Sequence, residues 1–77
     1  MTEEDFLKKI GKRIKQIRKE KGLSQQQFAA ALDYEKSNAS RLESGKINPK
    51  IGTLYKVAKV LNVTLSYLID NIDMEHK

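Results

Sequence analysis

The most restrictive feature of the sequence is a pair of short helical patterns joined by a tight link. The first opens with a capping box formed by Ser24 and Gln27 and ends near Leu32, after two turns. The second runs over about 36–44 and is closed by Gly45. Helices this short are not stable alone, because nucleation costs more than so few hydrogen bonds return. Both must therefore pack against a larger element.

A long amphipathic helix precedes this pair and can supply that element. Lys and Arg fill its polar positions, acidic residues at 3–5 suit its N-terminal end, and lysines before Gly22 suit its C-terminal end. Its apolar residues recur every three or four positions, which predicts about five helical turns. These apolar residues are Phe6, Leu7, Ile10, Ile14 and Ile17.

Two further helices are expected after the pair. One follows Pro49 and stops at Asn62, and a last one, capped by Thr64, runs from Leu65 to Ile69. Residues 70–77 lack an apolar face and are predicted to be a C-terminal tail. The sequence has no strand-like alternation, so the predicted fold class is all-α, a compact five-helix domain over residues 1–69. Its expected core after the first helix is Leu23, Phe28, Leu32, Ala39, Leu42, Leu54, Val57, Ala58 and Leu61.

The middle of the chain is strongly basic. Residues 6–69 carry 14 Lys or Arg against 4 Asp or Glu, although the whole chain has a formal net charge of only +5. Such a balance indicates a polyanionic partner, with nucleic acid ahead of a membrane surface. No apolar run approaches the ~20 residues of a membrane span, and the acidic N-terminus is unlike a secretory signal. We therefore expect a cytoplasmic protein, and the absence of Cys fits a reducing compartment.

Three sequence blocks resemble the Cro/repressor-type helix-turn-helix family, also called XRE-type. They are Leu23-Ser24-Gln25, the run SNASRLESGK over 37–46, and Thr53-Leu54 followed by Ala58, Leu61 and Val63. The resemblance implies a lambda-repressor-like fold with the helix-turn-helix at about 24–44. It also implies a sequence-specific transcriptional regulator, a repressor or autoregulator, that binds a palindromic operator in double-stranded DNA as a homodimer, with no cofactor and no metal.

Three neighbouring residues depart from the family pattern. Asp33 stands where Gly is typical in the turn, and Asp adopts the left-handed conformation more readily than most residues. Tyr34 replaces a small aliphatic residue, so its ring covers the turn or faces DNA. Glu35 replaces the Ser or Thr that caps the recognition helix, and its carboxylate would repel phosphate while favouring the helix dipole.

By the resemblance, the helix over 36–44 enters the major groove of DNA. Arg41 is the strongest candidate for base contact, because its guanidinium fork matches the O6 and N7 acceptors of guanine. The alternatives are a solvated Arg41 or one clamped to Glu35 or Glu43. The expected base-contacting residues are Lys36, Ser37, Asn38, Ser40 and Arg41. The expected phosphate-contacting residues are Gln25, Arg18, Ser44, Lys46, Asn48 and Lys50. For Gln25 the alternative is simple capping by Ser24, which would leave the Gln25 side chain in water.

The resemblance implies two further groups of residues. Arg18 and Glu43 match positions that form an ion pair between the first and third helices; the alternative is two exposed charges contributing about 0 to 1 kcal/mol. A dimer contact is expected near the C-terminal end, where the alternative is that the same residues only complete the monomer core. The expected dimer residues are Tyr55, Val63, Tyr67 and Ile69.

Other classes of function fit the sequence less well. An enzyme is not expected, because the chain has no Cys, its single His is His76 beside the end, and no motif places an acid/base pair. RNA or single-strand binding would need exposed aromatics, whereas most of the five aromatics here fall at helix-core spacings. The remaining alternative is an antitoxin or bridging protein-interaction module with secondary DNA binding.

Overall fold

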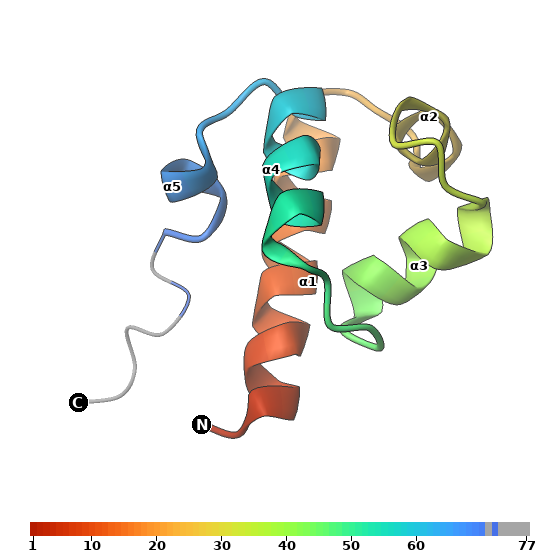
Figure 1. Cartoon of the computed structure of the whole chain (residues 1–77). Coiled ribbons are helices and arrows are strands. Elements are labelled where there is room, and N and C mark those ends of the chain that lie inside the picture. Colours follow the sequence, from red (N-terminus) through yellow and green to blue (C-terminus); the bar gives the residue numbers. More distant parts are fainter. Residues whose placement is uncertain (71, 73–77) are drawn as a thin grey trace.

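The computed structural model describes residues 1–70 and 72, which form five helices and, within those residues, no strand (Figure 1). The predicted all-α, five-helix fold is confirmed. In Figure 1, α2 and α3 lie on one side of α1 and α4, and α5 lies on the other. The helices are α1 (Glu3–Glu20), α2 (Gln25–Ala31), α3 (Lys36–Ser44), α4 (Ile51–Val60) and α5 (Leu65–Leu68).

Capping boxes start the first two helices. At α2 the expected box is present: the Gln27 amide donates to Ser24 Oγ at 3.0 Å, and the Ser24 amide donates to the Gln27 side chain at 2.8 Å. Sequence reasoning missed a second box at α1, where the Asp5 amide donates to Thr2 Oγ1 at 3.1 Å. The Glu35 side chain accepts no capping bond, so α3 begins without side-chain help.

Four of the helices end on a residue in the left-handed conformation. These residues are Gly22, Asp33, Gly45 and Asn62, with φ of 76°, 59°, 78° and 59°. Asp33 thus adopts the conformation expected of it in place of Gly. After each of these residues, the next amide donates back to a carbonyl five residues earlier, which closes the helix end. The bonds run from Leu23 to Arg18, Tyr34 to Ala29, Lys46 to Arg41 and Val63 to Ala58, at 2.8–3.1 Å.

The core follows most of the predicted apolar positions and also includes Ala29 and Leu68. Leu23 is only half-buried, because it lies in the α1–α2 link at the edge of the cluster. Ile72 is 8% exposed and belongs to the core, so apolar packing continues past the expected domain end at residue 69. The rest of the predicted tail, 71 and 73–77, lies outside the described residues. The largest fully buried side chains are Phe28, Ile14, Ile17, Leu32, Leu42, Leu61, Leu68 and Val57.

Candidate nucleic-acid interface

The outer face of α3 is polar and open to solvent. Its inner face buries Ala39, Leu42 and Glu43. Residues spaced by three or four share one side of a helix, so Ser37, Arg41 and Ser44 lie along the exposed side of α3. The structure leaves every side chain expected to contact bases exposed: Lys36, Ser37, Asn38, Ser40 and Arg41. No ion pair of Arg41 with Glu35 or Glu43 is recorded in the described part of the chain.

A buried ion pair holds α3 against α1. Arg18 Nε donates to Glu43 Oε2 at 2.6 Å, and Arg18 Nη2 donates to Oε1 at 3.2 Å. Arg18 Nη1 donates to the Leu23 carbonyl at 2.7 Å. The two side chains are only 7% and 3% exposed, which excludes the alternative of two solvent-exposed charges. The Arg18 hydrogen bonds use three of the five guanidinium N–H groups and leave one on each Nη, so phosphate contact through Arg18 stays a prediction.

The start of α2 joins the same carboxylate. Gln25 Nε2 donates to Glu43 Oε1 at 3.1 Å, and the Gln25 side chain is half-buried. Sequence reasoning considered only phosphate or water as partners for this amide. Glu43, a residue of α3, therefore accepts hydrogen bonds from both α1 and α2. These bonds hold α2 and α3, the two helices of the motif, at a fixed angle. The two Glu43 oxygens have charged and neutral donors, as a buried carboxylate requires.

Two glycines allow α1 and α3 to approach closely. A Cβ at Gly11 would lie 2.5 Å from the Glu43 carbonyl oxygen and 2.6 Å from that of Leu42. A Cβ at Gly45 would lie 2.6 Å from Lys8 Cα, and Gly45 also has a positive φ. Both contacts are with backbone, so neither can be relieved by moving a side chain. Sequence reasoning did not single out Gly11, since nothing near it in the chain shows which helix it meets.

The segment after α3 places several expected phosphate contacts together. Lys46 and Lys50 are exposed and come from the loop between α3 and α4. Ser44 Oγ donates to the Arg41 carbonyl at 3.2 Å. Asn48 Nδ2 donates to Glu3 Oε2 at 3.0 Å, a contact that the sequence analysis did not predict. This bond uses one of the two Nδ2 hydrogens and leaves the other for a phosphate.

The residues expected at a dimer contact lie around α4 and α5. Tyr55, Tyr67 and Ile69 are 57%, 46% and 40% exposed, and Val63 is half-buried. Most of this surface is therefore not used by the monomer core. Sequence reasoning missed Ile51, which is 67% exposed in the first turn of α4.

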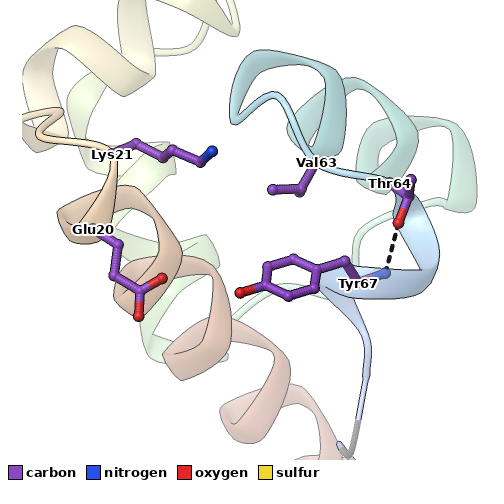
Figure 2. Close-up of a pocket in the computed structure, with 5 residues that line it drawn as sticks. All are labelled: Glu20, Lys21, Val63, Thr64 and Tyr67. Carbon is purple, nitrogen blue, oxygen red and sulfur yellow. Dashed lines mark hydrogen bonds between the residues drawn. The ribbon is translucent and has the colours of Figure 1, made fainter.

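Tyr67 lies beside a hollow between the end of α1 and the α4–α5 link, which Figure 2 shows with Glu20 and Lys21 on the α1 side and Val63 and Thr64 opposite. The Tyr67 amide donates to Thr64 Oγ1 at 3.0 Å, which caps α5. Arg13 Nη2 donates to the Tyr67 carbonyl at 2.8 Å, and its guanidinium carbon lies 4.6 Å from the ring centroid. The ring is thus held from α1 while its outer side stays open.

Neither a metal cluster nor a membrane-spanning helix occurs in the described residues. Within 1–70 and 72, no three His, Cys, Asp or Glu side chains lie close enough together to hold an ion. None of the helices is long and apolar enough to cross a bilayer over the same residues. His76 lies outside them.

Two short helices joined by a left-handed turn, with a polar outer face on the second, define a helix-turn-helix protein. The chain belongs to the helix-turn-helix family HTH_3, the XRE family, whose model matches residues 14–68. The expected family resemblance is thereby confirmed. This is a family of DNA-binding transcriptional regulators.

Three relatives illustrate the range of the family. Control protein C.MunI from a Mycoplasma species is 39% identical over 72 residues, which cover 92% of this chain and 97% of C.MunI. The transcriptional regulator SinR of Bacillus subtilis is 45% identical over 62 residues, 79% of this chain but only 56% of SinR. The restriction-modification controller C.AhdI from Aeromonas hydrophila superimposes with a TM-score of 0.76 at 31% identity, covering 80% of this chain and 94% of C.AhdI.

A solved structure of SinR contains DNA. SinR, described there as the master regulator for biofilm formation, has a TM-score of 0.70 and 45% identity to this chain in that complex. The match covers 79% of this chain and 98% of the SinR chain in the complex.

Proposed function

We propose that this chain is a sequence-specific regulator of transcription, a repressor or autoregulator, that binds a palindromic operator as a homodimer through the major groove. The observation that carries the proposal is the exposed polar face of α3, held at a fixed angle by the Glu43 hydrogen bonds to Arg18 and Gln25. A helix presented rigidly in this way can read base edges. This function requires no catalytic group. The protein would bind its operator in the cytoplasm.

The base-reading role belongs to the exposed residues of α3. Arg41 donates two parallel hydrogen bonds to the O6 and N7 of a guanine, and Lys36 reaches a base or a neighbouring phosphate. The short side chains of Ser37 and Ser40 permit close approach of the helix to the groove, with Asn38 at the flank of the face.

The phosphate-binding role falls to groups on both sides of α3. Lys46 and Lys50 bind one strand from the loop before α4, together with Ser44 and Asn48, whose second Nδ2 hydrogen is not used by Glu3. On the other side, the backbone amide of Gln25 faces the strand, since its side chain is engaged by Glu43. Arg18 positions Glu43 through their ion pair, and an N–H group on each Nη remains for a phosphate.

Dimerisation through the α4–α5 surface completes the proposal. Tyr55, Val63, Tyr67 and Ile69 supply its apolar side chains, most of them exposed in the monomer. Two-fold pairing there would set the two α3 helices about 34 Å apart, one turn of duplex, and would match a palindromic site.

Titration against DNA tests this function. The chain is titrated with the DNA upstream of its own coding sequence and with a random duplex of equal length, across a range of salt. We expect tighter binding to the upstream site at every salt concentration. Equal affinity for both duplexes throughout would overturn the claim of a sequence-specific regulator.

A protein-interaction module is the second candidate function. Ile51 and Tyr55, exposed on α4, favour it, as does the solved complex of SinR with the protein SinI, in which SinR is 40% identical to this chain. In this function the apolar α4 face would hold a protein partner and DNA binding would be secondary. An α4 face that stays solvent-accessible in the homodimer, together with weak operator preference, would select this alternative.

A further inference from the structure

A row of four lysines runs along α1 outside the site described above. Lys8, Lys12, Lys15 and Lys19 are spaced by four, three and four residues, so they lie on one side of the helix. All four are exposed, and none has a recorded ion pair with a described residue. The row spans about 16 Å at the 1.5 Å rise of an α-helix. Four charges of the same sign in a line favour a polyanionic partner.

The row lies on the margin of α1 that borders the helix-turn-helix. Lys15 is one turn from both Gly11 and Arg18, and each of these contacts α3. Lys8 touches the end of α3, since a Cβ at Gly45 would lie 2.6 Å from its Cα. The opposite margin of α1 faces α5, where Arg13 meets Tyr67. Lys8 and Lys15 are therefore on the side of α1 next to the DNA-reading helices, and Lys19 is one turn beyond Lys15. Lys12 instead lines a hollow with Arg13, Asp70 and Ile72.

We propose that the lysine row binds the phosphate backbone of DNA just outside the half-site. This inference rests on the proposed function. Arg18 follows Lys15 by one helical turn and directly precedes Lys19. It donates to the carbonyl of Leu23, which lies in the link just before α2. These two lysines are therefore near the start of α2. We expect a DNA strand that contacts the first turn of α2 to pass close to them as well. Lysine is suited to this role, because it meets phosphate as a flexible point charge and carries no sequence information.

The position of α2 in a dimer decides which DNA the row meets. Figure 1 shows α2 and α5 on opposite sides of α1 and α4. When two copies pair through the α4–α5 surface, the α2 end of each copy points away from the two-fold axis. The lysines next to α2 then face flanking duplex rather than the centre of the operator. Binding of an acidic protein to the lysines would not depend on the length of the DNA. An effect that appears only on a longer duplex therefore distinguishes DNA from an acidic protein as the partner.

The test compares the intact chain and Lys15→Gln/Lys19→Gln on two operator duplexes. One duplex ends at the outer base pairs of the operator, and the other has one extra helical turn on each side. On the long duplex we expect the variant to lower the salt slope by about two, at ~0.9 per phosphate contact. Between about 50 and 200 mM salt, the intact chain should then lose roughly tenfold more affinity than the variant. On the short duplex the two should agree.

A matched control removes two lysines from another exposed face. Lys56→Gln/Lys59→Gln on α4 loses the same charge and should keep the long-duplex slope of the intact chain, with dimerisation checked by sedimentation. Equal slopes for the lysine-row variant and the intact chain on the long duplex would overturn the proposal. So would a difference that persists on the short duplex, or an equal loss in the control. The preference of the intact chain for the short operator over random duplex tests the proposed function separately.

Discussion

The two sides of this molecule differ in how far their side chains are buried and hydrogen-bonded. On the α2–α3 side, polar groups are buried and bonded: Arg18, Glu43 and Gln25 form one network, and glycine contacts bring α1 and α3 together. On the α4–α5 side, apolar side chains such as Tyr55 and Tyr67 remain open to solvent. One side is a surface whose shape is set within a single chain. The other is a surface whose apolar side chains the single chain leaves exposed.

This contrast suggests that the two sides serve different steps. If Arg41 binds a guanine as proposed, α3 must be rigid before it meets DNA, because a misoriented guanidinium cannot form two hydrogen bonds to one base. An association surface gains by being apolar, because burying it supplies the free energy of pairing. Substitutions on the α2–α3 side should therefore change folding and reading, whereas those on the α4–α5 side should change assembly.

The largest effect is expected from Glu43→Ala. The substitution leaves the buried Arg18 guanidinium without its counter-charge, which costs about 3–5 kcal/mol of unfolding free energy. Urea denaturation measures it. As a control, Arg18→Met/Glu43→Leu removes both charges and should recover most of that loss. A loss below about 1 kcal/mol for Glu43→Ala, the scale of a solvated surface pair, would show that the pair is exposed in solution.

A smaller loss of stability is expected from Gly11→Ala. The new methyl group would meet the carbonyl oxygens of Leu42 and Glu43, and such overpacking costs about 1–3 kcal/mol. Gly52→Ala is the matched control, because nothing lies within 4 Å of that position, also inside a helix. It should stabilise α4 by about 0.5–1 kcal/mol. Thermal unfolding of both variants tests the close contact, and a stabilised Gly11→Ala would contradict it.

Arg41→Ala and Lys46→Ala should weaken DNA binding in different ways. Arg41→Ala is expected to cost about 1–3 kcal/mol and to relax preference at one base pair, whereas Lys46→Ala should weaken all sequences alike and lower the salt slope by about one. Titrations with an operator and its single-base variants distinguish the two. A uniform loss for Arg41→Ala would mean that Arg41 binds phosphate.

The smallest effect on the monomer is expected on the α4–α5 side. Tyr55→Ser and Ile69→Ser change exposed side chains, so each should alter unfolding free energy of the isolated chain by no more than about 0.5 kcal/mol. Both should nevertheless shift the dimer toward monomer in sedimentation equilibrium. Ile51→Ser changes a side chain that is 67% exposed but lies outside the proposed contact, and it serves as the comparison. Unchanged association in both variants would exclude this surface as the dimer contact.

The sequence predicted those parts of the structure that depend on neighbouring residues. Helix periodicity gave the core positions, and the Ser24 box and the left-handed Asp33 were expected because their causes lie within a few residues. The box at Thr2 was missed although it is equally local, since the acidic residues after it already accounted for the helix start. Local chemistry is therefore readable from the sequence when each residue of the turn is considered.

Contacts between distant segments could not be predicted in the same way. Gly11 looks like any helical glycine until α3 crosses it, and the Asn48 bond to Glu3 joins residues 45 positions apart. Gln25 was assigned to phosphate or water because Glu43 was not known to lie beside it. Ile72 was missed because it follows the last helix, where periodicity no longer applies. Each of these depends on which helices meet, which the pattern of one helix does not contain.

The four left-handed helix ends have a consequence for how the protein forms. Each chain reversal is specified within about six residues, by one residue at positive φ and one backbone bond across it. Helix ends specified by so few neighbouring residues can form without contacts between distant segments. Helical domains with mostly local contacts fold in about microseconds to milliseconds. Ribosomal synthesis of a chain this size takes seconds, at about 5–20 residues per second. The chain therefore reaches its reading conformation almost as soon as it is released.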